Sequence, residues 1–351
     1  MKRASGERSG KRLLDILDGA LTHEPPIWFM RQAGRYLPEY RAVRAKAGGF
    51  VELCLNPELA AEVTLQPVRR FGLDAAIIFS DILIVPHALG VKLWFEENEG
   101  PRLEPVNDIA SFERMQPVLD RKITQPVYDA LKIVRDALPA NVTLIGFCGA
   151  PWTVASYLIA GRGTEEQGPA KALMRGDEKL FASIIDRLAD ATAHHLIGQI
   201  DAGADVVQIF DTWAGSLNEH EFGRWCAAPI ARIASAVRAA RPQARVILFP
   251  KGVKIEWMKR LVSEAEADAI SLDPITNRKR AREVFSGICA LQGNLSPDVL
   301  LDGGDAMDRE IDQILEDFRG TRHIFNLGHG ILKETPIAHV ERMIARVRER
   351  A

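Results

Sequence analysis

Four arginines near the start of the chain are the side chains best suited to chemistry. Arg31, Arg35, Arg41 and Arg44 lie in the segment IWFMRQAGRYLPEYRAVR, residues 27–44, after a short apolar run. Arginine presents a rigid fork of donors that matches a carboxylate or phosphate two hydrogen bonds at a time. Gly34 and Pro38 argue against one long helix here. The segment is therefore either a loop that binds a ligand with several negative charges or a solvated basic helix face.

Asp81 is the acidic residue whose setting best suits it to act with these arginines. It stands in IIFSDILIV, residues 77–85, with apolar residues on both sides. A buried carboxylate without a partner is costly, so Asp81 either caps a helix or meets a cationic or N–H-rich ligand. We favour the second interpretation, because such a carboxylate is a strong acceptor and stabilises positive charge that develops in a reaction.

Three further polar side chains follow apolar runs. Tyr157 ends GAPWTVASY, Thr212 lies in IFDTWAG, and His329 stands between two glycines in NLGHGI. Glycines let the backbone approach a ligand closely, but they also form simple tight turns. Packing would explain the tyrosine equally well. Each residue carries little meaning alone, and the set gains meaning only if the fold brings its members together.

Composition excludes several classes of protein. The net charge of the 351 residues is only −2, so no global basic field exists to hold nucleic acid, and the positive charge near residue 31 is local. The four cysteines lie dozens of residues apart without a C-x-x-C pair, which favours buried, reduced thiols over a zinc site or a disulfide framework. His194 and His195 are expected to be core or surface residues. No metal site and no nucleotide-binding or nucleophile-elbow motif is legible.

The chain start indicates no export signal. Residues 1–20 are basic without a long apolar stretch, so we expect a flexible tail over 1–10 that leads into a short helix. The most apolar later segment, residues 75–91, is broken by Asp81, Pro86 and His87, well short of the ~20 apolar residues that span a bilayer. We therefore expect no membrane association and a cytoplasmic location.

Strand-like and helix-like segments alternate along the chain. Eight apolar runs read as buried parallel strands, at 27–30, 75–79, 143–147, 206–210, 245–249, 269–272, 288–292 and 324–327. Helical patterns lie between them: 57–71 with Asn56 as its cap and Gly72 at its end, 180–203, 219–240, and a last helix with Val340, Ile344 and Val347 on one face. Irregular residues 97–105 suggest an excursion. The pattern predicts a single α/β domain over 11–351, a (β/α)8 TIM-type barrel.

In such barrels the working residues follow the carboxyl ends of the strands. Any one of these residues could be a helix cap or a turn residue. Their convergence on one mouth is what indicates an active site there. In chain order they are Arg31; Ser80 and Asp81; Cys148 and Gly149; Asp211 and Thr212; Lys251 and Gly252; Asp273; Gly293 and Asn294; and Gly328 and His329.

Four segments resemble the uroporphyrinogen decarboxylase family. They are MRQAGRYLPEYR at 30–41, LQPVRRFGLDAAIIFSDIL at 65–83, GAPWT at 149–153 and NLGHGI at 326–331. The resemblance implies a homodimeric (β/α)8 barrel without cofactor or metal. It also implies conversion of uroporphyrinogen III to coproporphyrinogen III, with loss of CO2 from the acetate side chains, during haem biosynthesis.

The resemblance also implies roles for individual residues. Arg31, Arg35 and Asp81 match the family's motifs most securely, and some members have Ser in place of Thr212 and Phe in place of Tyr40. The catalytic residues implied are Asp81, Arg31, Tyr157 and His329. The residues implied to bind the substrate are Arg31, Arg35, Tyr40, Arg44, Asp81, Tyr157, Thr212 and His329.

The implied chemistry agrees with the residues. Arginines would hold the carboxylates around the macrocycle, while Asp81 accepts the pyrrole N–H groups and stabilises a cation formed by protonation of a ring carbon. Arg31 is either the proton donor or a carboxylate anchor, because a guanidinium is a reluctant acid. Three other functions stay open: a zinc-dependent methyl-transfer barrel, a non-catalytic tetrapyrrole carrier, and phosphate-sugar chemistry at the Gly293 and Gly328 loops.

Overall fold

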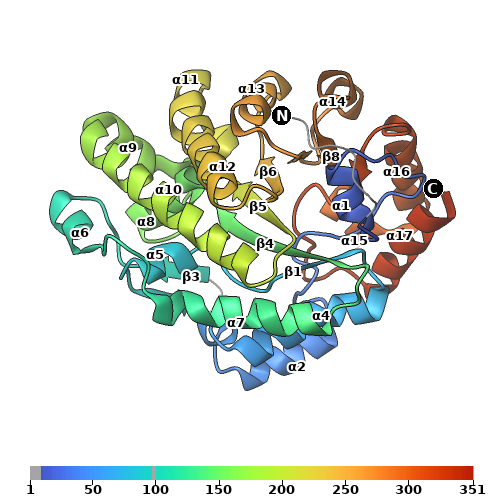
Figure 1. Ribbon diagram of the computed structural model, residues 1–351, viewed down its shortest axis with the longest axis horizontal. Helices are drawn as coiled ribbons and strands as arrows, with labels where there is room; N and C mark the ends of the chain where they lie inside the picture. The colour runs from blue at the N-terminus through green and yellow to red at the C-terminus, as the bar shows by residue number, and fades with distance from the viewer. Residues whose placement is uncertain (1–8, 97–99, 351) are drawn as a thin grey trace.

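The computed structural model describes residues 9–96 and 100–350. Its main sheet is curved and has seven parallel strands in the order β1-β4-β5-β6-β7-β8-β9, with helices around the outside (Figure 1). The strands are β1 Ala75–Ile77, β4 Thr143–Gly149, β5 Val206–Asp211, β6 Val246–Pro250, β7 Ala269–Ser271, β8 Ala290–Gln292 and β9 His323–Ile324. Seven of the eight predicted runs are therefore strands, and the α/β class is confirmed.

The main helices follow the strands in alternation. They are α4 Pro57–Phe71, α7 Arg121–Ala137, α8 Pro151–Ala160, α10 Glu178–Asp201, α12 Ala228–Ala240, α13 Ile255–Ala265, α14 Arg278–Phe285, α16 Gly304–Asp317 and α17 Ile337–Arg350. The shorter helices include α1 Arg12–Leu17, α2 Pro38–Lys46, α3 Phe50–Cys54 and α5 Ile84–Ala88. Each main helix buries apolar side chains on one side, as α17 does with Val340, Ile344 and Val347.

Local signals set the helix ends. The Asn56 side chain accepts a hydrogen bond from the Leu59 N–H at 2.9 Å, and α4 ends at Gly72, whose φ is 62°. Residues 57–71 thus form the predicted helix. The stretch 219–240 is not one regular α-helix: α11, Glu219–Phe222, passes through a π-helical turn at Gly223–Ala227 into α12.

The run at 27–30 does not form a strand, which corrects the prediction of eight. Ile27 makes an isolated parallel bridge to Phe325 beside β9. On the other side its carbonyl accepts a hydrogen bond from the Asp74 N–H at 2.9 Å, next to β1. The segment thus contacts both edges of the sheet, but its hydrogen bonding ends early because the backbone turns at Arg31, where φ is 62°.

The inner face of the sheet has an apolar floor and a polar layer. The helix α1 packs Leu13 and Leu17 against the first residues of several strands, including Val206 and Ala290. Above this floor, Gln292 accepts a hydrogen bond from the Trp28 indole at 3.0 Å and donates to Gln208 and Ser271 at 3.1 Å each. Because alternate strand residues face the same side, these layers lead toward the carboxyl ends of the strands.

The predicted excursion at 97–105 includes the strand β3, Gly100–Leu103, which pairs antiparallel with β2, Leu93–Glu96, just before it. Residue 97, the first of the range assigned to the excursion, lies outside the described residues, as do residues 1–8 of the predicted tail. All four cysteines are free and buried, as predicted. No helix within the described ranges has the length and apolar character needed to cross a bilayer.

Candidate active site

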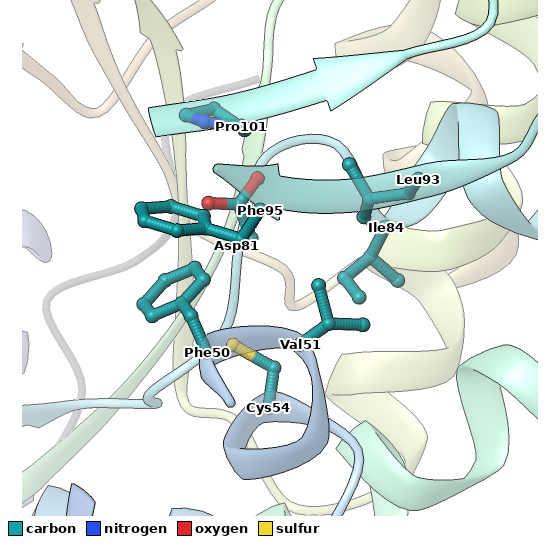
Figure 2. A pocket seen from close by; sticks show the side chains of 8 residues that line it. All are labelled: Phe50, Val51, Cys54, Asp81, Ile84, Leu93, Phe95 and Pro101. Atoms are coloured by element: carbon teal, nitrogen blue, oxygen red, sulfur yellow. The ribbon is translucent and has the colours of Figure 1, made fainter. Parts of the chain in front are cut away.

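Asp81 lies just beyond β1 and forms one wall of a pocket. The other lining residues are Phe50, Val51, Cys54, Ile84, Leu93, Phe95 and Pro101 (Figure 2). One carboxylate oxygen accepts a hydrogen bond from the Leu83 N–H at 2.8 Å, at the start of α5. Burial raises the pKa of Asp81, while the Leu83 N–H and the charge of Arg31 act in the opposite direction. Asp81 is thus both a local cap and a pocket carboxylate.

Arg31 is held against the His329 loop by its own backbone turn. A Cβ atom added to Gly330 would lie 2.4 Å from Arg31 Cδ, so only glycine leaves room for this side chain. The loop is anchored by a 3.0 Å hydrogen bond from the Ile331 N–H to the Met30 carbonyl. The second glycine of NLGHGI therefore positions an arginine and does more than form a turn.

His329 is a neutral imidazole in this setting. Its ring centroid lies 6.2 Å from that of Phe249, and its Nδ1 is buried without a hydrogen-bond partner in the described part of the chain. Burial lowers the pKa of His329 to about 4, and the positive charges of Lys251 and Arg31 add to the effect. At neutral pH the ring can donate one hydrogen bond and accept another.

Tyr157, on α8, completes a group with Arg31 and Asp81. Burial raises the pKa of Tyr157; the Asp81 charge raises it further, while the Arg31 charge lowers it. Its ring centroid lies 6.4 Å from that of Trp213. Arg31 packs against Gly330, next to His329. Its charge also influences the pKa of Asp81, Tyr157 and His329, so the four residues predicted to be catalytic lie within electrostatic reach of one another.

Arg35, Tyr40 and Arg44 form the neighbouring wall, on α2 and the turn before it. Tyr40 is buried, with its ring centroid 5.6 Å from that of Phe79. Burial raises the pKa of Tyr40, and the charges of Arg44 and Arg35 oppose this. The Arg44 guanidinium lies 5.3 Å from the Phe50 ring centroid, a cation–π contact. This wall meets the pocket through Phe50 (Figure 2).

Arg41 has a different role from the other three arginines of the segment. Its guanidinium donates to the carbonyl oxygens of Arg35 and Tyr36, at 2.6 and 3.3 Å. It therefore stabilises the backbone of the loop that carries Arg35. This contact agrees with the absence of Arg41 from the residues that the family resemblance implies for substrate binding.

Thr212 is positioned by a buried hydrogen bond between Thr153 and Asp211, which the sequence did not reveal. The Thr153 hydroxyl donates to Asp211 Oδ1 at 2.5 Å and accepts from the Trp213 N–H at 3.1 Å. The Trp152 indole donates to the Trp213 carbonyl at 3.0 Å. Burial raises the pKa of Asp211 to about 6. Asp211 thus faces α8 and fixes the chain on either side of Thr212, and the motifs GAPWT and DTW were its only sequence signal.

Four cations around the mouth have no acidic partner in the part of the chain that the structure describes. Within residues 9–96 and 100–350, no ion pair or side-chain hydrogen bond is made by the charged groups of Arg31, Arg35, Arg44 or Lys251. In the same ranges, no three His, Cys, Asp or Glu side chains gather as a possible metal site. The site therefore offers the Asp81 carboxylate, the hydroxyls of Tyr40, Tyr157 and Thr212, and the His329 imidazole. The unpaired positive charges around them suit a ligand with several carboxylates.

Solved structures share this fold. A methyltransferase from Methanosarcina mazei aligns with a TM-score of 0.76 and 22% identity, covering 98% of this chain and 99% of that one. A B12-independent methionine synthase from Shewanella sp. aligns with a TM-score of 0.53 and 10% identity, covering 93% and 94% of the two chains. At such low identities the likeness establishes the fold alone.

Sequence relatives are much more similar. The family model described as uroporphyrinogen decarboxylase (URO-D) matches residues 8–350. The uroporphyrinogen decarboxylase of Sphingopyxis alaskensis is 50% identical over 343 residues, which are 97% of this chain and 98% of that protein. That of Brucella anthropi is 48% identical over 341 residues, 96% and 98% of the two chains. The chain therefore belongs to the uroporphyrinogen decarboxylase family.

Proposed function

We propose that this protein decarboxylates the four acetate side chains of uroporphyrinogen III, giving coproporphyrinogen III and CO2 in haem biosynthesis. The observation that carries the proposal is the presence in one site of Asp81, a partly buried carboxylate in a pocket wall, and Arg31, whose charge acts on Asp81 and which forms no ion pair in the described structure. Relatives about 50% identical over nearly the whole chain support the same reaction.

Binding uses both kinds of charge. The substrate carries carboxylates around its edge and pyrrole N–H groups toward its centre. Arg31, Arg35 and Arg44 bind the carboxylates, with Tyr40 in the wall beside them, while the Asp81 oxygens accept the pyrrole N–H groups. Thr212 contributes a hydroxyl. Because these cations have no counter-ion among the described residues, the substrate gains charge-assisted hydrogen bonds without breaking existing ones there.

The chemical step needs an electron sink. Protonation of a pyrrole ring carbon gives a cation, and the bond between the acetate methylene and its carboxyl carbon then breaks. The electron pair moves into the ring and CO2 leaves; protonation of the resulting exocyclic methylene and loss of the ring proton leave a methyl group. Asp81 stabilises the cation, an effect worth ~10²-fold to 10³-fold in rate.

The proton donor is one of a small group. Because a guanidinium is a reluctant acid, Arg31 acts first as a carboxylate anchor, with proton donation as its second candidate role. Tyr157 and neutral His329 lie in the same electrostatic group and assist by hydrogen bonding. A pH–rate profile that stays unchanged on replacing either residue would remove it from acid–base catalysis.

One assay tests the function. The protein is incubated without oxygen with chemically reduced uroporphyrin, and the oxidised products are separated by chromatography. Coproporphyrin together with partly decarboxylated intermediates supports the proposal. Unchanged uroporphyrin bound to the protein would identify a carrier instead. Activity that survives exhaustive chelation agrees with a reaction that needs no metal or cofactor, whereas loss on chelation points to zinc-dependent methyl-transfer chemistry.

The proposal extends to the architecture and assembly. Segment 27–30 occupies the position of the eighth strand and closes a (β/α)8 barrel. Residues 11–351 fold as one catalytic domain. The protein works as a cytoplasmic homodimer. The closure is supported by hydrogen bonds to both sheet edges, between Ile27 and Asp74 on one side and between Phe325 and both Pro26 and Trp28 on the other. Sedimentation analysis and cell fractionation test the assembly and the location, and a monomer at micromolar concentration would contradict the dimer.

A further inference from the structure

Lys251 enters the mouth from the side opposite the arginines. It directly follows β6, the middle strand of the seven, whereas segment 27–30 hydrogen-bonds beside β1 and β9 at the two edges. The backbone of Lys251 is fixed, since its N–H donates to the Asp211 carbonyl at 3.1 Å and its carbonyl accepts from the Gly215 N–H at 3.0 Å. The backbone position of Lys251 is therefore fixed at the end of β6, across the sheet from segment 27–30.

The Lys251 side chain points toward the His329 loop. Ile247 and Phe249, four and two residues earlier, belong to the inner core of the sheet, and alternation continues that direction to Lys251. The Phe249 ring contacts the His329 ring. The positive charge of Lys251 is, after burial, the largest influence that lowers the pKa of His329. The ammonium group thus lies within the candidate site.

Within residues 9–96 and 100–350, no carboxylate forms an ion pair with the Lys251 ammonium. Asp211 accepts a hydrogen bond from Thr153 through Oδ1, and Asp273 accepts from the Gly252 N–H at 2.7 Å and from the Thr276 hydroxyl at 2.6 Å. Throughout the described ranges, no hydrogen bond or ion pair of the Lys251 ammonium is found, although the side chain is partly buried. A partly desolvated cation without a counter-charge is costly, and an anionic ligand would remove that cost.

We propose that the Lys251 ammonium binds a carboxylate of the macrocycle on the side of the mouth opposite Arg31, Arg35 and Arg44. This proposal rests on the proposed function, because it takes the polycarboxylate substrate as the ligand. A macrocycle with carboxylates around its whole edge presents negative charge to both walls. Cations on one wall alone would leave the far carboxylates to solvent, so Lys251 orients the ring and adds affinity.

Lys251→Gln tests the proposal, with Lys254→Gln as the matched control. Lys254 is in the same loop, is exposed, and lies 5.2 Å from the Trp257 ring centroid, so its replacement makes the same charge change outside the site. In anaerobic initial-rate assays with uroporphyrinogen, we expect Lys251→Gln to raise KM by about tenfold, as for loss of one charged hydrogen bond, and to change kcat by less than about threefold. Lys254→Gln should match the wild type, and Lys251→Arg should recover most of the affinity.

Two results would overturn the proposal. The first is an unchanged KM in Lys251→Gln. The second is a fall in kcat with an altered pH profile at unchanged KM, which would mean that Lys251 acts only through His329.

A binding measurement separates this proposal from the proposed function. Quenching of tryptophan fluorescence by uroporphyrinogen reports affinity even when no CO2 is released. A protein that binds without turnover contradicts the decarboxylase, but Lys251→Gln must still weaken binding relative to Lys254→Gln. A wild-type protein that does not bind uroporphyrinogen contradicts both proposals.

Discussion

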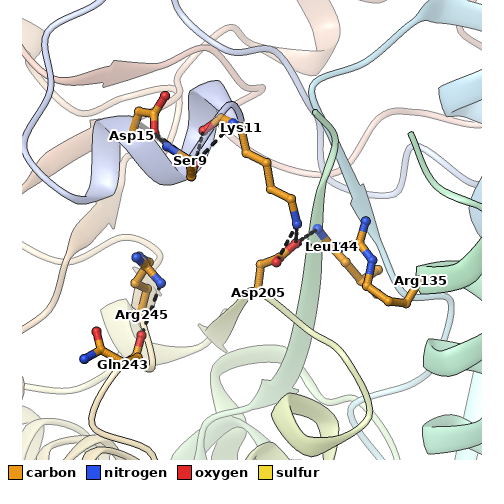
Figure 3. A network of polar contacts seen from close by, with 8 residues as sticks. All are labelled: Ser9, Lys11, Asp15, Arg135, Leu144, Asp205, Gln243 and Arg245. Atoms are coloured by element: carbon orange, nitrogen blue, oxygen red, sulfur yellow. Dashed lines mark hydrogen bonds and ion pairs between the residues drawn. The ribbon is translucent and has the colours of Figure 1, made fainter. Parts of the chain in front are cut away.

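The two ends of the parallel strands treat charge in opposite ways. At the amino-terminal end, Asp205 accepts hydrogen bonds from Lys11 at 2.6 Å, Arg135 at 2.9 Å and the Leu144 N–H at 2.7 Å (Figure 3). Nearby, Arg12 pairs with Asp74 at 2.8 Å. At the carboxyl end, the described structure shows no such partners for four cations: Arg31, Arg35, Arg44 and Lys251. Charged side chains therefore pair with one another at the amino-terminal end of the strands, whereas at the carboxyl end cations remain free to bind a ligand. We call these the closed end and the open end.

Asp81→Asn should have the largest effect and test the open end. Asparagine keeps the oxygen that accepts the Leu83 N–H hydrogen bond but loses the negative charge. We expect kcat to fall by about 10²-fold to 10³-fold, because the cation on the ring loses its stabilising charge. The midpoint of urea unfolding should stay unchanged or rise, because a desolvated charge is removed.

Steady-state assays without oxygen check the kinetic result. Asp205→Asn is measured in parallel, because it removes a carboxylate at the amino-terminal end of the strands. Near-normal turnover of Asp81→Asn would rule out the charge-stabilising role. An equal loss in Asp205→Asn would remove the distinction between the two ends.

Asp205→Asn should lower the stability of the protein and leave catalysis unaffected. The neutral amide weakens the hydrogen bonds from Lys11 and Arg135, and these two cations lose the negative charge of the carboxylate that they share. We expect the free energy of unfolding to fall by about 2 kcal/mol, below the range for a fully buried pair because the carboxylate is 18% exposed. Urea unfolding measures the loss. Unchanged stability together with reduced kcat/KM would reverse the assignment of the two ends.

Gly330→Ala tests whether the open end depends on shape as well as charge. The new methyl group would meet Arg31 Cδ and force the side chain aside. We expect kcat/KM to fall by about tenfold, equivalent to about 1.4 kcal/mol, with little change in the urea midpoint. Gly176→Ala is the control, because a Cβ atom there meets nothing within 4 Å. A variant with wild-type kcat/KM would mean that the position of Arg31 is not critical.

Most strands could be predicted because burial on both faces leaves a continuous apolar run. The β4, β5 and β6 segments read directly in this way, and the Asn56 cap and Gly72 end of α4 are local signals. The failure at 27–30 has a different origin. Its hydrogen-bond partners, Asp74 and Phe325, are distant in sequence, and the turn at Arg31 uses a backbone conformation that arginine rarely adopts.

The candidate site was predictable only where its residues stand in distinctive motifs. Arg31, Asp81, Tyr157 and His329 each follow an apolar run, and the structure places them in one electrostatic group. The contacts that position them cross between elements and leave no local pattern. The bond from Thr153 to Asp211 spans 58 residues, which explains why sequence alone missed it.

The smallest predicted effect concerns the charge balance of the open end. The pKa of His329 is about 4, below the value of ~6.5 in an unfolded chain, so the unfolded state binds more protons between these values and stability falls as pH drops through that window. Lys251→Gln removes a positive charge near the ring. We therefore expect the pKa of His329 to rise above its wild-type value, and the loss of stability on acidification to become smaller.

Titration of 13C-labelled histidine by NMR measures this change, and two other histidines serve as internal controls. Burial lowers the pKa of His195 and of His323 to about 4, with no contribution from Lys251. These two rings should titrate identically in the wild type and in Lys251→Gln. If all three resonances shift together, the substitution has altered the fold in general. If none shifts, the Lys251 ammonium lies too far from His329 to belong to the site, and the contrast between paired and unpaired cations then rests on the arginines alone.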